Sequence, residues 1–284
     1  MLGAGVAAGA GRGPMTAPVR VPTGASIGDG DRRLLAWVGR FRFVTAGLVA
    51  ERFGVTVQMA RRWVARLVAI GLLGRERAGR TDEYAVYLTA PGARVLGLPR
   101  RRPPRVTVHR EHELAIVWLA SRIERATARR VLSERECRYL EAADAGRFSV
   151  EVGRATGRGD RRRWPDLVLE DPGRRVAVEI EFAPKGSVRL GAIVDGYLHS
   201  TGLTEVRFLV SEPATAGRLA GIVAAETVAA TTRALFPIQP PRVAVSPWTD
   251  ATAVEQAAVQ RAIDAVERDH GLLPISDRRN SPGA

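Results

Sequence analysis

Two neighbouring segments of the sequence place acidic side chains where they could share a cation. The segment "WPDLVLE" begins with Pro165 and Asp166, and "RVAVEIEF" carries Glu179 and Glu181 two positions apart. Successive side chains of a β-strand point to opposite faces, so the two glutamates would share one face and Val176, Val178, Ile180 and Phe182 the other. We expect Asp166, at the start of an adjacent strand, to converge on them.

Carboxylates at close range repel one another unless a cation neutralises them, and hard oxygen ligands favour Mg²⁺ or Mn²⁺. Such an ion activates water and stabilises the phosphate during hydrolysis of a phosphodiester. Lys185, the only lysine among 43 basic residues, lies four positions after Glu181 and would add positive charge there, with Arg189 as a second candidate. The predicted catalytic residues are Asp166, Glu179, Glu181 and Lys185, and the predicted metal ligands are Asp166, Glu179 and Glu134.

Each of these residues also has a plainer interpretation. An edge strand with one face in solvent would carry alternating glutamates without any metal. Glu113 is a further candidate ligand, but solvent-facing charge for Glu113 and an ion pair for Glu134 are equally open. His109 and His112 lie three positions apart without a third histidine or a cysteine nearby, so we do not expect a zinc site. Tyr197 is predicted to lie in the core.

The elements that would position these residues alternate between helix and strand over residues 107–248, which favours an α/β domain. A long helix is expected over 107–126, then a strand or a strand running into a turn over 129–136. A charged loop over 153–163 leads to strands over 164–170 and 175–182, with a tight turn at 171–173 between them. A helix over 187–202, a strand over 205–211, a helix over 213–235 and a strand over 242–248 would complete the domain.

The positive charge is concentrated in the first third of the chain. Residues 1–105 hold 18 arginines and six acidic residues, whereas residues 106–284 hold 25 basic and 24 acidic residues. A local basic surface is the electrostatic signature of a polyanionic partner, and phosphate contacts supply much of the affinity for nucleic acid. This asymmetry points to a nucleic acid, and the basic helix described below makes double-stranded DNA the expected partner.

Residues 31–97 are predicted to form three helices and a β-hairpin, which is the order of a winged helix-turn-helix. Leu34, Leu35 and Val38 are expected in the core, Thr45 and Thr56 are expected to cap the second and third helices, and Gly54 to end the second. The third helix, "VQMARRWVARLVAIG", would bury Ala60, Val64 and Leu67 along one stripe.

The opposite stripe of that helix is polar and basic, as a helix in the DNA major groove requires. The predicted DNA-binding residues are Gln58, Arg61, Arg62 and Arg66 on the helix and Arg75, Arg77 and Arg80 on the hairpin, whose tip is expected at 79–82. A solvated charged face is the alternative for a single basic helix.

The remaining segments set the domain boundaries. Residues 1–30 and 273–284 are expected to be disordered tails, and the Pro- and Arg-rich segment 98–106 a linker. An amphipathic helix is predicted over 249–272, either packed on the second domain or mediating a homodimer. The single cysteine, Cys137, suits a reducing cytoplasm. No apolar run approaches the roughly 20 residues of a membrane helix, so no membrane association is expected.

The predicted order helix, strand, strand, strand, helix, strand, together with Pro165, Asp166 and Glu179, resembles the PD-(D/E)xK restriction-endonuclease-like fold. The motif of that family has a lysine two positions after the glutamate, where this chain has Glu181. More narrowly, "HELAIVWL", "LSERE", "WPDLVLEDPGRRVAVEIE" and "RLGAIVDGY" resemble the replication-relaxation family of actinobacterial plasmids and integrative elements, over about residues 31–225. The E-x-acid form at Glu179 and Glu181 is expected in that family.

The resemblance implies a DNA-binding protein that acts in plasmid replication, DNA relaxation or transfer, with or without metal-dependent cleavage of DNA. Replication or conjugation proteins would then be further partners. Two other functions stay open at this point: a non-catalytic winged-helix transcriptional regulator and a structural partner in a replication or conjugation complex.

Overall fold

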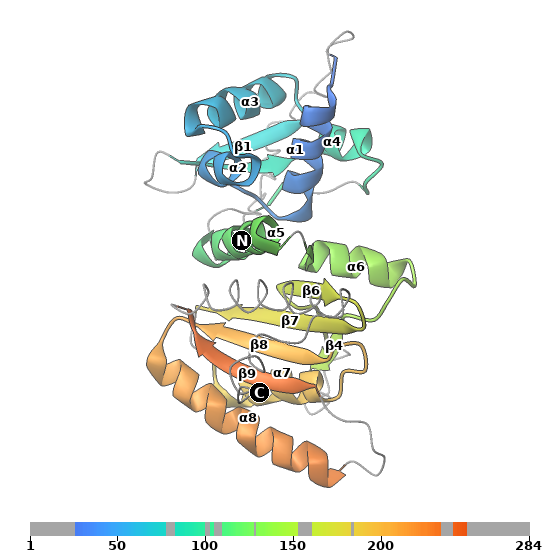
Figure 1. Cartoon of the computed structure of the whole chain (residues 1–284), viewed down its shortest axis with the longest axis vertical. Helices are drawn as coiled ribbons and strands as arrows, with labels where there is room; N and C mark the ends of the chain where they lie inside the picture. Colours follow the sequence, from blue (N-terminus) through green and yellow to red (C-terminus); the bar gives the residue numbers. More distant parts are fainter. Residues whose placement is uncertain are drawn as a thin grey trace, which may run out of the picture.

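The computed structural model describes residues 26–77, 83–99, 103–104, 110–127, 129–152, 161–182, 185–233 and 241–248. Over these residues the protein has a mixed α/β fold, built around one mixed β-sheet (Figure 1). The expected tail up to residue 25, the hairpin tip, the C-terminal helix over 249–272 and the last residues lie outside the described residues. No helix in the described part of the chain is long and apolar enough to cross a membrane.

The first part of the chain folds into a small helical unit with a β-hairpin. Its elements are α1 (Asp29–Arg40), α2 (Ala46–Phe53), α3 (Val57–Ala69), β1 (Leu73–Arg77), β2 (Tyr84–Leu88) and α4 (Ala90–Val95). The Thr45 and Thr56 hydroxyls accept hydrogen bonds from the backbone N–H groups of Leu48 and Met59, so both predicted caps are confirmed. Gly54 ends α2 in the left-handed conformation (φ 65°), which glycine adopts without steric cost. Helix α1 begins two residues earlier than expected.

The second part of the chain supplies the large sheet and the helices that cover it. Its elements are α5 (Arg110–Thr127), β3 (Arg130–Ser133), α6 (Glu134–Ala142), β4 (Val150–Val152), β5 (Arg161–Arg163), β6 (Leu167–Asp171), β7 (Arg174–Glu181), α7 (Ser187–Leu198), β8 (Glu205–Val210), α8 (Pro213–Arg233) and β9 (Arg242–Pro247).

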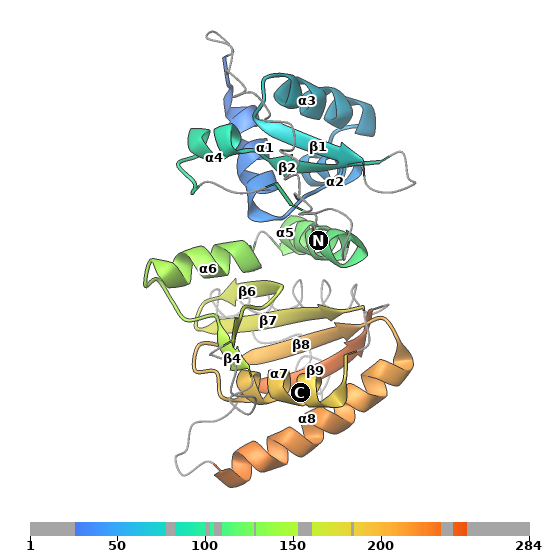
Figure 2. The same ribbon diagram turned by 180° about the vertical axis from the view of Figure 1, so that it is seen from behind.

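The five-stranded sheet has the order β3-β6-β7-β8-β9. Strands β3, β6 and β7 are antiparallel neighbours, whereas β8 is parallel to β7 and β9 is parallel to β8. Helix α5 lies between one face of the sheet and the small helical unit, and α7 and α8 lie on the opposite side, as both views show (Figure 1; Figure 2). Strand β7 is therefore the central strand and is covered on both faces.

The two faces of β7 carry the side chains that the alternation predicts. Val176, Val178 and Ile180 belong to the core that α5 shares with the small helical unit. Ala177, on the other face, belongs to the core formed with α7 and α8. Glu179 and Glu181 follow Ala177 at two-residue intervals, so both lie on the α7 side.

Two regions differ from the sequence-based expectation. Helix α6 replaces the expected turn after β3, and it begins with a capping box in which Ser133 and Glu136 exchange side-chain to backbone hydrogen bonds. The last three residues of the expected charged loop form β5, which pairs antiparallel with β4, the strand directly before that loop. A three-residue strand of arginines has no apolar alternation, so its pairing depends on tertiary contacts.

Candidate functional site

Asp166, which directly precedes β6, and the two glutamates of β7 are buried at the centre of the sheet. Glu179 is 2% exposed, Glu181 is 5% exposed and Asp166 is 8% exposed. The alternative of an edge strand with solvated glutamates is wrong, because β7 pairs with β6 on one side and β8 on the other. A buried carboxylate must be paired or hydrogen-bonded to remain charged, so the partners of these groups decide what they can do.

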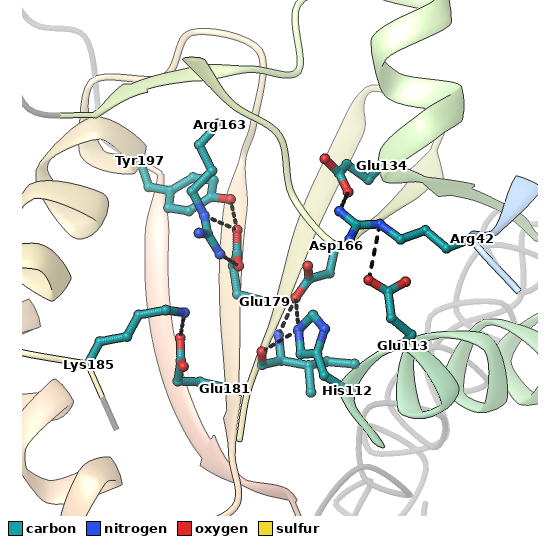
Figure 3. Close-up of polar contacts among 11 residues, drawn as sticks. Arg42, His112, Glu113, Glu134, Arg163, Asp166, Glu179, Glu181, Lys185 and Tyr197 are labelled. Atoms are coloured by element: carbon teal, nitrogen blue, oxygen red, sulfur yellow. Dashed lines mark hydrogen bonds and ion pairs between the residues drawn. The ribbon is translucent and has the colours of Figure 1, made fainter. Parts of the chain in front are cut away.

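Glu179 is held by an arginine and a tyrosine. The Arg163 Nε on β5 donates to Glu179 Oε1 at 3.2 Å, and its Nη2 donates to Oε2. The Tyr197 hydroxyl on α7 also donates to Oε1. Figure 3 shows the guanidinium and the phenol converging on this one carboxylate. Both oxygens of Glu179 therefore have a protein donor.

Asp166 is held by a backbone amide and a histidine. Its Oδ2 accepts a hydrogen bond from the Ile180 N–H at 2.8 Å and lies 3.2 Å from the His112 Nε2. The same imidazole nitrogen lies 2.9 Å from the Ile180 carbonyl oxygen. The histidine comes from α5 and reaches the point where β6 begins beside β7 (Figure 3).

Glu181 has its own cation. The Lys185 Nζ, between β7 and α7, donates to Glu181 Oε2. We expected this lysine to face a phosphate, but its ammonium group is bound to the carboxylate four residues earlier. Arg189, the second candidate, is exposed on the first turn of α7.

Glu134 and Glu113 share an arginine from the small helical unit. The Arg42 Nε lies 3.1 Å from Glu113 Oε1, and its Nη2 lies 3.7 Å from Glu134 Oε2. Glu134 also forms an ion pair with Arg138 one turn later on α6, at 2.5 Å. The predicted ligand Glu134 is therefore in an ion-pair network rather than beside Glu179, as Figure 3 shows.

The charges of this cluster shift its proton affinities. Burial raises the pKa of the Glu179 carboxyl, and the ion pair with Arg163 opposes that shift. The Glu179 carboxylate raises the pKa of Arg163 well above its usual value. For His112, burial lowers the pKa. The hydrogen bond and charge of Asp166, the charge of Glu113 and the hydrogen bond with the Ile180 backbone together outweigh burial and leave the pKa above its ordinary value.

The carboxylates do not fit a divalent metal ion in this arrangement. Mg²⁺ and Mn²⁺ require several oxygen ligands with lone pairs directed at one point. Here both oxygens of Glu179 accept hydrogen bonds from Arg163 or Tyr197, Oδ2 of Asp166 accepts one from the Ile180 amide, and Glu181 is bound to Lys185. Within the described residues no group of three or more His, Cys, Asp or Glu side chains is placed to hold a metal ion.

Sequence reasoning missed two of the residues that define the site and misjudged a third. The sequence pattern places Arg163 in a charged loop and offers His112 only as a candidate zinc ligand. Tyr197 was expected in the core, and it is fully buried there, but its hydroxyl is bound to Glu179. A buried tyrosine hydroxyl normally needs a hydrogen-bond partner. The buried position expected for Tyr197 could therefore have indicated that its hydroxyl binds a polar group.

The second candidate surface is the outward face of α3. Ala60, Val64 and Leu67 are buried as predicted, and Gln58, Arg61 and Arg62 are exposed. Arg66 is also largely exposed, but its guanidinium is bound to Asp31 on α1. Among the described residues, neither Arg61 nor Arg62 has an acidic partner.

The hairpin carries two of the three predicted wing arginines within the described residues. Arg75 and Arg77 are exposed on β1. The Arg75 guanidinium lies 5.0 Å from the centroid of the Tyr84 ring on β2. Arg80 lies outside the described residues.

No family model, curated protein or solved structure matches this chain. The fold defines it as a mixed α/β protein with a small helical unit on one side of the sheet.

Proposed function

We propose that this chain binds double-stranded DNA and that α3 is its recognition helix. One observation carries the proposal: Arg61 and Arg62 are adjacent, exposed and without an acidic partner in the described part of the chain. Several arginines elsewhere are neutralised in place. Arg130, Arg163 and Arg174, for example, form ion pairs with Glu170, Glu179 and Glu205. The unpaired charge on α3 is thus available for phosphates.

The surrounding elements support a winged helix-turn-helix. Three residues connect α2 to α3, with Gly54 in the left-handed conformation, which suits the short glycine-containing turn of a helix-turn-helix. The antiparallel hairpin of β1 and β2 follows α3 directly. Gln58 lies on the exposed first turn of α3, from which its amide can pair with an adenine edge in the major groove.

The hairpin would add contacts outside the major groove. Arg75 and Arg77 lie on β1, on the chain segment that leads to the wing tip. In this proposal they meet the DNA backbone or the minor groove beside α3. Such contacts would fix the orientation of the protein on the duplex and add affinity without reading sequence.

Helix α6 and the β4–β5 hairpin are inserted between β3 and β6. Apart from this insertion, the order α5, β3, β6, β7, α7, β8 repeats the helix and strand order of the PD-(D/E)xK fold, which supports a nuclease-like origin for the second unit. The contacts of its carboxylates give hydrolysis no support. We therefore propose that the protein acts by binding DNA in the replication, relaxation or transfer of a plasmid or integrative element. A transcriptional regulator would make the same DNA contact.

The proposal is tested by fluorescence anisotropy with a random-sequence DNA duplex over a range of salt concentrations. Each lost phosphate contact reduces the slope of log K against log salt by about 0.9. Arg61→Ala plus Arg62→Ala should therefore weaken binding and reduce that slope by up to about 2. The charge-matched control is Arg94→Ala plus Arg189→Ala, which removes two exposed arginines from α4 and α7. Equal losses in the two double variants would refute α3 as the contact.

Gln58 tests sequence recognition separately. Gln58→Ala should leave binding to the random duplex nearly unchanged. On duplexes enriched by selection with the unaltered protein, it should cost about 1–3 kcal/mol. An equal effect on both kinds of duplex would mean that Gln58 does not read a base.

A further inference from the structure

Arg163 reaches Glu179 because the hairpin of β4 and β5 is fixed against α7. Val150 of β4 lies in the core that α7 and α8 form with the sheet. At Gly196 of α7 the backbone of Glu151 comes so close that a Cβ there would lie 2.6 Å from the Glu151 carbonyl oxygen. A residue with a side chain at 196 would push the hairpin away, so glycine permits this contact. Arg163, paired with Val150, is thereby held over β7.

The guanidinium meets the carboxylate with matched geometry. Two of its nitrogens, Nε and Nη2, contact the two oxygens of Glu179, which is the bidentate arrangement that arginine forms with carboxylates. The side chain of Glu179 is 2% exposed and that of Arg163 is 26% exposed, so the arginine lies between the carboxylate and solvent. The Asp166 charge also contributes to the raised pKa of Arg163, which places both carboxylates in the field of this one cation.

A guanidinium at this position supplies the positive charge that a metal ion would supply. It is permanently charged, and it compensates the repulsion between Asp166 and Glu179 without an exchangeable ligand. Each glutamate of the E-x-E segment then has its own side-chain cation, since Lys185 neutralises Glu181 in the same way.

We propose that Arg163 is a built-in cation that replaces a divalent metal ion beside Glu179, so that the α/β unit keeps its acidic centre charged and folded without binding metal. The inference concerns the α/β unit alone and does not depend on DNA binding by α3. In this proposal Glu179 is in a permanent ion pair and is not available as a ligand for Mg²⁺ or Mn²⁺.

Mn²⁺ binding to the full-length protein, measured by electron paramagnetic resonance of the free ion, tests this inference without reference to DNA. The unaltered protein and Glu179→Gln should bind Mn²⁺ equally weakly. Arg163→Met, which keeps side-chain length and loses the charge, should gain Mn²⁺ affinity by at least about tenfold. Arg163→Met combined with Glu179→Gln should lose that gain. Arg163→Lys, which retains a charge, should resemble the unaltered protein.

Two results would overturn the inference. The first is Mn²⁺ binding by the unaltered protein that Glu179→Gln weakens by about tenfold or more. The second is an Arg163→Met protein with an unchanged near-ultraviolet circular dichroism spectrum and no gain in Mn²⁺ affinity. If Arg163→Met does not fold, the comparison of the unaltered protein with Glu179→Gln decides the matter. DNA binding serves as a separate readout, because its loss in the α3 variants leaves the Mn²⁺ result unaffected.

Discussion

The Arg66 guanidinium on α3 is bound to the Asp31 carboxylate on α1, 35 positions earlier in the chain. The same carboxylate accepts a hydrogen bond from the Trp63 indole N–H at 2.7 Å. Arg66 and Trp63 of α3 thus both bind Asp31 of α1. Arg66 resembles Arg61 and Arg62 in sequence, but its charge is already compensated within the protein.

This difference predicts separate phenotypes for arginines on one helix. Arg66→Ala should lower the free energy of unfolding by about 1 kcal/mol, because Asp31 loses a charged hydrogen bond although Trp63 remains. Arg62→Ala, an exposed arginine without an ion pair in the described residues, should change it by less than about 0.5 kcal/mol. Urea unfolding followed by tryptophan fluorescence measures both. If Arg66→Ala is as stable as Arg62→Ala and equally impaired in DNA binding, the charge of Arg66 is not compensated by Asp31 as we expect.

Arg40 is predicted to join the two parts of the molecule. Its guanidinium lies 2.6 Å from Glu124 on α5 and 2.9 Å from Glu136 on α6, and its side chain is 15% exposed. Arg40→Ala would leave two partly buried carboxylates short of a partner, although Arg52 remains 3.2 Å from Glu124. We expect a loss of about 2 kcal/mol in unfolding free energy.

The control for Arg40 is Arg130→Ala. Arg130 also forms an ion pair, with Glu170 at 3.2 Å, but its side chain is 63% exposed. Exposed ion pairs contribute little, so this variant should lose less than about 1 kcal/mol. Equal stability of the two variants in urea unfolding would show that Arg40 does not hold the parts together.

Titration of His112 should make the stability of the protein depend on pH. Its pKa is raised in the folded protein, so the protonated form contributes stability that is fully present below the ordinary value of 6.5 and is lost as the pH rises through the folded pKa. His112→Gln retains an N–H donor near Asp166 and cannot titrate. The unaltered protein should therefore lose more unfolding free energy than His112→Gln as the pH rises above 6.5. Parallel pH profiles of the two proteins would show that protonated His112 does not stabilise the fold.

Tyr197 is predicted to stabilise the buried carboxylate of Glu179. Tyr197→Phe removes one of its donors inside the core, and the poorly satisfied oxygen should cost about 1–2 kcal/mol of unfolding free energy. Tyr139→Phe is the matched control, because Tyr139 is 57% exposed on α6. Thermal unfolding should show a clearly lower midpoint for Tyr197→Phe only. Identical midpoints would mean that the hydroxyl of Tyr197 adds nothing.

Local periodicity predicted much of this fold. The stripe of Ala60, Val64 and Leu67 and the alternation along β7 follow from helix and strand geometry alone. The caps at Thr45 and Thr56 are equally local, because a cap and the N–H that it binds lie three positions apart. The start of α6 was not predicted, although Ser133 and Glu136 have the spacing of a capping box and could have indicated it.

The partners of the acidic residues were not predictable from the sequence. Asp166 meets a histidine 54 positions away, and Glu179 meets an arginine from a hairpin without a periodic pattern. The sequence determined which residues carry charge and which face of each element they occupy, because those properties repeat over a few residues. Only the tertiary structure decided which charges neutralise one another, because an ion pair depends on the distance between elements that the chain brings together from far apart.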